Sequence, residues 1–166
     1  MSYSIVYSSR TGNTRQLAES IRETLGEKDL IYFGAPDNSA LAADRIYVGF
    51  WTDKGTRNQE TAEFLKTVRD REVFLFGTAG FGGDSRYFKE ILKKIEHALG
   101  PDVSLVGTWM CQGKMPLAVR ERYVKMKESH IPVHHVDQLI ENFDKALSHP
   151  DSADLADLAA VIRETH

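Results

Sequence analysis

Short apolar runs alternate along this chain with longer segments in which apolar residues recur every three or four positions. The runs predict five strands, whose largely apolar composition is typical of parallel strands covered on both faces: Tyr3–Tyr7, Asp29–Phe33, Arg45–Phe50, Val73–Gly77 and Ser104–Trp109. The periodic segments predict helices over 13–25, 58–69, 85–99 and 116–128, with only an abbreviated crossover over 34–44. This alternation favours an α/β fold with a doubly wound, five-stranded parallel sheet.

The last part of the chain predicts helices without further strands. Val136–Leu147 and Leu155–Ile162 are the two helical segments there. We therefore expect a main domain over residues 1–132 and extra C-terminal helices over 133–166 that pack on the same domain. Docking of this extension on a partner or on a second subunit is the alternative.

Composition and charge narrow the class of protein. The 166 residues fit one domain, and a formal net charge of −3 with a pI near 6.1 gives no support for non-specific nucleic-acid binding. Cys111 is the single cysteine, which excludes an intrachain disulfide and suits a reducing compartment. The sequence shows neither a signal-peptide pattern nor an apolar run of membrane-spanning length. We therefore expect a cytoplasmic protein that binds neither nucleic acid nor membrane.

The loop after the first predicted strand carries the clearest chemistry. Residues 8–14 hold four hydroxyl side chains and one glycine, and the helix over 13–25 begins there. A helix N-terminus offers free N–H groups and a favourable dipole to an anion, and hydroxyls add hydrogen bonds. The loop has no lysine and lacks the G-x-x-x-x-G-K-[ST] pattern of polyphosphate sites. A single phosphate monoester is therefore the better ligand.

Residues 5–21 resemble the phosphate loop of flavodoxins, in which an apolar strand ends in a Ser/Thr-x-Thr-Gly-Asn-Thr core. The resemblance extends over roughly the first 128 residues and implies a flavodoxin-like fold with strand order 2-1-3-4-5. It also implies FMN as the cofactor, because this loop wraps the single 5′-phosphate of FMN in that family. The matching residues are Ser9, Arg10, Thr11, Gly12, Asn13 and Thr14. A helix cap that is rich in Ser and Thr by accident is the alternative.

The same resemblance implies two further loops that hold the flavin ring. Flavodoxins commonly stack an aromatic residue after the third strand on one ring face, and Trp51 occupies that position, whereas we expect Phe50 to belong to the core. The other expected contacts are Thr52, Asp53, Lys54 and Gly55 after the third strand, and Thr78, Ala79, Gly80 and Phe81 after the fourth.

The second ring face has two candidate aromatic residues. Gly83–Tyr87 is similar to the family's Gly-Asp-Ser-x-Tyr segment, in which the tyrosine covers that face. This segment lies farther from the strand end than in short flavodoxins, so Tyr87 and Phe81 both remain candidates. Asp84 and Ser85 are equally well explained as helix caps.

Two departures from the family pattern concern the surroundings of the flavin. Thr52 stands where many flavodoxins have a glycine whose peptide flips, and a β-branched residue is strained at positive φ, so we expect that flip to be hindered. Lys54 and Arg57, with Arg10 and Arg86, differ from the acidic surroundings that are usual in the family. The alternative is that these charges form a solvated rim that has little effect on the flavin.

The segment Trp109–Pro116 leaves the last predicted strand at the same edge of the sheet, one or two strands away from the flavin. Its thiol, amide and lysine side chains suit a groove for a substrate or partner. Cys111 has no activating neighbour other than Lys114, so we expect a buried strand-end residue rather than a nucleophile.

The resemblance implies an FMN-binding redox protein that carries electrons to a partner reductase or reduces a small acceptor. A non-catalytic interaction module that kept the fold is the alternative. The extended C-terminal part is similar to that of certain bacterial flavodoxin-like proteins, some of which accompany flavin-dependent reductases of tetrapyrroles such as bilirubin. The chain has no G-x-G-x-x-G motif for a second nucleotide, so we do not expect it to oxidise NAD(P)H alone. The oligomeric state stays open.

Overall fold

The sheet has the strand order that the sequence predicts. The computed structural model describes residues 1–81, 85–129 and 135–166. Its strands are β1 Tyr3–Tyr7, β2 Leu30–Gly34, β3 Arg45–Asp53, β4 Thr56–Arg57, β5 Glu72–Ala79 and β6 Ser104–Gln112. The parallel strands lie in the order β2-β1-β3-β5-β6, and the short β4 pairs antiparallel with the end of β3. Since β4 stands outside the parallel set, this is the predicted 2-1-3-4-5 order.

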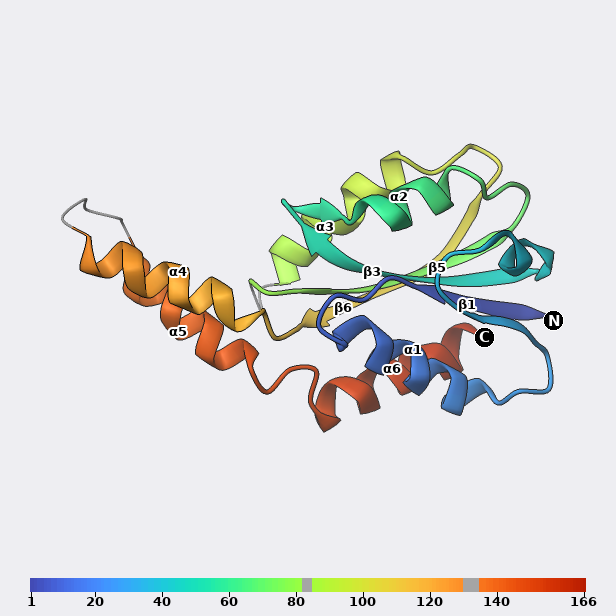
Figure 1. The fold of residues 1–166 in the computed structure, drawn as a ribbon. Coiled ribbons are helices and arrows are strands. Elements are labelled where there is room, and N and C mark those ends of the chain that lie inside the picture. The colour runs from blue at the N-terminus through green and yellow to red at the C-terminus, as the bar shows by residue number, and fades with distance from the viewer. Residues whose placement is uncertain (82–84, 130–134) are drawn as a thin grey trace.

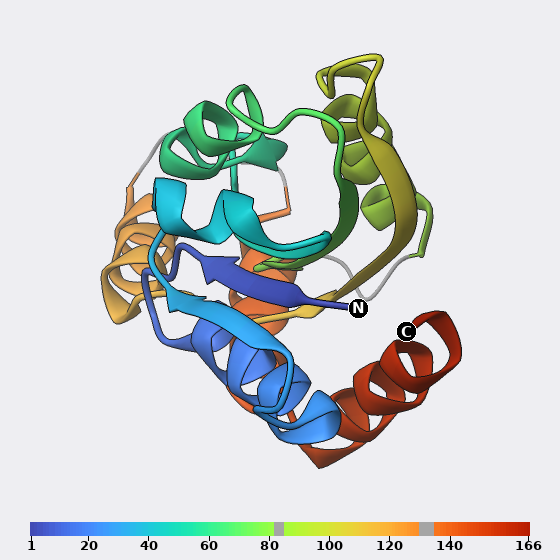
Figure 2. The same ribbon diagram turned by 90° about the vertical axis from the view of Figure 1, so that its right-hand side faces the viewer.

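Helices cover both faces of the sheet (Figure 1, Figure 2). One face carries α1 Asn13–Leu25 and α6 Ser152–Thr165, and the other carries α2 Gln59–Leu65 and α3 Ser85–His97. The crossover between β2 and β3 holds only the 3-10 turn η1 Asn38–Ala42, as its length predicts. Both α2 and α3 end before their predicted limits, because bonds from N–H to the carbonyl three residues back replace the α-helical pattern there.

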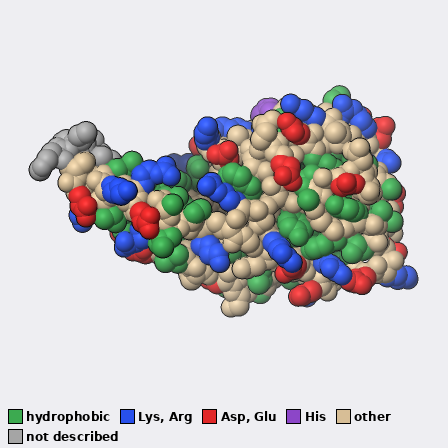
Figure 3. Space-filling view, viewed as in Figure 1, with side chains coloured by type: hydrophobic (Ala, Val, Ile, Leu, Met, Phe, Trp, Pro, Cys, Tyr) green, Lys and Arg blue, Asp and Glu red, His purple; other side chains and the backbone are tan. Residues whose placement is uncertain are grey.

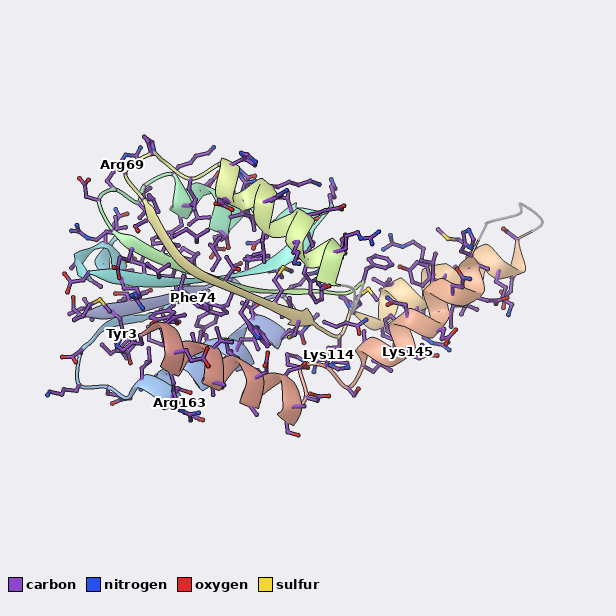
Figure 4. All side chains as sticks on the ribbon, turned by 180° about the vertical axis from the view of Figure 1, so that it is seen from behind. Tyr3, Arg69, Phe74, Lys114, Lys145 and Arg163 are labelled. Atoms are coloured by element: carbon purple, nitrogen blue, oxygen red, sulfur yellow. The ribbon has the colours of Figure 1, made fainter. Side chains whose placement is uncertain are left out.

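Two apolar clusters fill the space between the sheet and its helices. Phe50 and Ile95 are buried in the cluster on the α2–α3 face. Phe74 and Leu158 are buried in the cluster on the α1–α6 face, where Figure 4 shows Phe74 and Tyr3 between the sheet and α6. Because both faces are covered, each central strand is apolar along its length rather than alternately apolar and polar.

The strands that carry the carboxyl edge of the sheet are longer than predicted. The strands β3, β5 and β6 run two or three residues past their predicted ends, to Asp53, Ala79 and Gln112. The added residues are paired with neighbouring strands, and Trp51 opposes Thr78 across β3 and β5. Several residues that the apolar pattern assigns to loops are therefore held by the sheet itself.

The helices after β6 divide into a projecting pair and a returning helix. The pair consists of α4 Leu117–Glu128 and α5 Val136–Ala146, which pack along each other and project from the carboxyl edge of the sheet (Figure 1). Helix α6 returns to pack against α1 and β6. The predicted domain boundary at residue 132 falls outside the described residues. Among the described helices, none combines the length and apolar character needed to cross a membrane.

Candidate functional site

A cavity of about 250 Å³ lies at the carboxyl edge of the sheet, beside the base of the α4–α5 pair. Segments that follow β1, β3, β5 and β6 meet there, although they are far apart in the sequence. Most of the predicted site residues line this cavity: Arg10, Thr11, Asn13, Trp51, Thr52, Asp53, Lys54, Gly55, Thr78, Gly80, Phe81 and Tyr87. The structure thus brings the predicted phosphate loop and both predicted ring loops to one place.

The phosphate loop turns into α1 at Gly12, whose φ of 87° lies in the left-handed region that glycine tolerates. The backbone N–H of Gly12 donates to Ser9 Oγ at 3.1 Å, which closes the turn. Within the described residues no side chain caps this helix, so its first-turn N–H groups are open to an anion. This is the local geometry that the hydroxyl-rich sequence predicts.

Four of the predicted site residues lie behind the cavity wall or beside it. Ser9 and Gly12 border a separate hollow, together with Tyr7, Arg15 and Glu60. Thr14 is buried, and its hydroxyl donates to the Phe50 carbonyl at 3.3 Å. Ala79 is a buried residue of β5. Any contact of Thr14 with a phosphate therefore involves its backbone N–H, while its side chain ties α1 to β3.

The segment after β6 is part of the cavity rather than one or two strands away from it. Gly113, Lys114, Met115, Pro116 and Val119 complete the lining. Asn13 Nδ2 donates to the Lys114 carbonyl at 2.8 Å, which joins this segment to the phosphate loop. The expected groove and the expected flavin site are therefore one cavity.

Trp51 is half-buried and its backbone is fixed on both sides. Its N–H donates to Asn58 Oδ1 at 3.3 Å, and its carbonyl accepts from the Asn58 N–H at 3.1 Å. The Arg10 guanidinium lies 5.7 Å from the indole ring, within range of a cation–π contact. Phe50, the preceding residue, is fully buried in the core as expected. A wall of the cavity is thus an aromatic residue whose backbone is held in place.

Thr52 lies outside the positive-φ region in which a β-branched residue is strained. It belongs to β3 and opposes Arg57 of β4, while the positive φ values fall on Lys54 (52°) and Gly55 (81°) in the two-residue turn. That pattern is typical of a type I′ hairpin. The Thr52 hydroxyl donates to the Thr78 carbonyl at 2.8 Å, so the two ring loops are tied together. The expected hindrance of a peptide flip at Thr52 stays a prediction, and its place in the strand agrees with it.

Two amide side chains hold the loop after β5. Gln112 Nε2 and Asn142 Nδ2 donate to the Gly80 carbonyl at 3.1 and 3.0 Å, and Gln112 Nε2 also lies 3.1 Å from Asn142 Oδ1. Asn142 belongs to α5 and is 62 residues away from Gly80 in the chain. Sequence reasoning missed it, because no local pattern reports such a long-range contact.

Cys111 is a buried residue near the end of β6, as predicted. Burial raises the pKa of its thiol well above the ordinary value, and the nearby Asp154 and Asp151 carboxylates raise it further. A protonated thiol is a weak nucleophile, so Cys111 fills space rather than reacting.

A model of the flavodoxin domain family matches residues 4–163. This chain belongs to the flavodoxin family. It is 42% identical over 173 residues to the "Flavodoxin-like domain-containing protein BilS" of Clostridium symbiosum (strain WAL-14163), with 94% of this chain and 91% of that protein covered. The match to the flavodoxin family extends into α6 and ends at residue 163.

Solved structures show the same flavodoxin fold. Oxidised Flavodoxin 2 from Bacillus cereus superposes with a TM-score of 0.61 at 17% identity, and the match covers all of both chains. A flavoprotein from Lactobacillus acidophilus NCFM, determined in complex with FMN, gives a TM-score of 0.51 at 16% identity over 66% of this chain and 92% of that one. The predicted family and fold are therefore confirmed, and the family match supports FMN as the cofactor.

Proposed function

We propose that this flavodoxin-family protein binds FMN in the cavity and carries electrons to a partner reductase. The observation that carries the proposal is the meeting of three elements in one cavity. These are the loop residues that lead into α1, the tryptophan at the end of β3 and a glycine-containing loop. The loop over residues 9–14 would hold the phosphate, and Trp51 would stack on the ring.

The donor set of the cavity suits this cofactor. Asn13 Oδ1 is buried without a hydrogen-bond partner among the described residues, and a hydroxyl of the ribityl chain is a donor of the kind it lacks. Thr11, Trp51 and Gly80 line the same cavity and provide a hydroxyl, an aromatic ring and open backbone. Polar groups for the phosphate and apolar surface for the ring are therefore both present.

Bound FMN supplies reversible uptake and release of electrons, and the residues of this chain control where and how tightly it sits. Trp51 offers a flat apolar surface whose stacking adds about 0.5–1.5 kcal/mol beyond burial. The Thr52–Thr78 hydrogen bond holds the two ring loops at a set separation. The Gln112–Asn142 pair fixes the peptide after Gly80, so its N–H keeps one orientation. These contacts favour a preorganised site.

The lack of a binding motif for a second nucleotide favours a carrier role over independent catalysis. The sequence contains no second nucleotide motif through which NAD(P)H would bind. The resemblance to proteins that accompany flavin-dependent reductases points to such a reductase as the partner. Direct reduction of a small acceptor is the second candidate, because part of the cavity lining remains open to solvent.

Anaerobic flavin absorbance separates a carrier from an NAD(P)H-dependent enzyme. We expect the FMN-loaded protein to keep its visible absorbance when mixed with NADH or NADPH alone, and to lose it with dithionite. Free FMN serves as the control for slow chemical reduction. Rapid bleaching by NADPH without any added reductase would contradict the carrier role.

A further inference from the structure

Positively charged side chains surround the cavity on a chain whose net charge is −3. Arg10, Lys54 and Lys114 line the cavity directly. Arg57 opposes Thr52 across the hairpin, and Lys94 Nζ lies 3.4 Å from the Gly55 carbonyl, so both lie against residues of the lining. We call these five residues the mouth cations.

The mouth cations are not neutralised within the described part of the chain. The ion pairs of that part, such as Arg120–Asp144 and Arg45–Glu72, involve none of the five. Among the described residues, Asp53 is the single acidic residue in the cavity lining. A phosphate monoester carries about −1.5 to −2 charges at neutral pH, so the cations remain in excess with FMN bound. The mouth therefore has the opposite sign to the molecule as a whole.

The shape of this region suits contact with another macromolecule. The α4–α5 pair projects beside the cavity, and Figure 4 places Lys114 where the sheet edge meets this pair. Leu117, at the start of α4, is 65% exposed and follows Pro116, which lines the cavity. Figure 3 shows Lys and Arg side chains where the pair joins the body. Charge complementarity, rather than this single exposed leucine, therefore decides which partner the region suits.

We propose that the mouth cations and the adjoining start of α4 dock a redox protein whose surface is acidic around its electron-exchanging group. A positive mouth attracts such a partner over a Debye length and orients it with its redox centre toward the cavity. The negative remainder of the chain repels the same partner from other faces. Docking in the wrong orientation is thereby disfavoured.

This proposal rests on the proposed electron-carrier function, and small redox ions test the two separately. The reduced, FMN-loaded protein is mixed anaerobically with hexacyanoferrate(III), an anion, or with hexaammineruthenium(III), a cation. Raising the salt from about 10 to 300 mM should slow the anion reaction about five-fold and should not slow the cation reaction. Failure to bind FMN, or no reaction with either ion, overturns the carrier function. If the protein reduces both ions but the rate with hexacyanoferrate(III) rises with salt, only the docking proposal is overturned.

Reversing the charge of one lysine beside the cavity and of one lysine far from it tests whether the attraction is local to the mouth cations. Lys94→Glu changes a mouth cation outside the cavity lining, and Lys28→Glu makes the same change in net charge between α1 and β2, near the opposite edge of the sheet. At low salt, Lys94→Glu should lower the hexacyanoferrate rate about three-fold or more and flatten its salt dependence, whereas Lys28→Glu should stay within about two-fold of the parent. Equal effects of the two variants contradict a local docking field.

Basic cytochrome c extends this test to a protein acceptor. Its reduction by the parent protein should accelerate as salt screens the repulsion between two positive surfaces. A rate that falls with salt would contradict the preference for an acidic partner.

Discussion

Replacing Gly113 by alanine should weaken FMN binding by about 30-fold, within the 1–3 kcal/mol range expected for overpacking. A Cβ at this position would lie 2.5 Å from Asn13 Nδ2 and 3.1 Å from Thr78 Cβ. The Asn13 side chain would have to move, and its hydrogen bond to the Lys114 carbonyl would be lost. Because Asn13 belongs to the proposed phosphate loop, the displacement should reach the proposed cofactor site directly. Calorimetric titration of the apoprotein with FMN measures the loss.

Gly100→Ala is the matched control for this substitution. The nearest atom to a Cβ at Gly100 is Asp102 Oδ1 at 2.9 Å, the end of a side chain that can rotate away, and the site is remote from the cavity. This variant should bind FMN as tightly as the parent. Circular dichroism establishes that both variants are folded. An unchanged FMN affinity in folded Gly113→Ala would contradict the placement of Gly113 against the cofactor loop.

Replacing Leu158 by alanine should lower the free energy of unfolding by about 3 kcal/mol, because a fully buried leucine leaves a cavity when it is truncated. Leu158 is 0% exposed and lies in one cluster with Ile5, Leu17 and Phe74. We infer that α6 belongs to the cooperative core, so the variant should still unfold in one transition. Urea unfolding followed by circular dichroism and by tryptophan fluorescence gives both quantities.

Leu147→Ala tests whether this loss depends on burial. Leu147 is 51% exposed at the end of α5, and its truncation should cost less than about 1 kcal/mol. If Leu158→Ala were no more destabilising than Leu147→Ala, or if it produced a separate early transition, α6 would be an appendage instead of part of the core.

The sequence predicts the fold well because each strand or helix has its own apolar pattern within a short stretch of residues. Covered parallel strands give continuous apolar runs, and helices on the sheet give periodic ones, so the element types follow from the pattern, whereas the strand order follows from the resemblance to flavodoxins. The ends of strands are harder to predict. Thr52 is polar and precedes turn residues, yet its pairing with Arg57 keeps it in β3, and the positive φ moves to Lys54 and Gly55.

Part of the candidate site can be predicted because its residues lie together in the sequence. Arg10, Thr11 and Asn13 follow from a contiguous motif, and the cavity includes them. Thr14 belongs to that motif too, but its hydroxyl faces the core because α1 packs on β3. The role of Asn142 at Gly80 depends on how α5 projects past the sheet, which no short stretch of sequence encodes.

Paired calorimetric titrations with FMN and riboflavin test the central claim most directly, because the two ligands differ only in the phosphate. Hydrogen bonds to a charged group contribute about 1.5–3 kcal/mol each, so FMN should bind at least about 100-fold more tightly than riboflavin. Trp51 fluorescence should be quenched at the same stoichiometry. Equal affinity for the two ligands, or no heat with FMN, would contradict a phosphate-binding loop at residues 9–14.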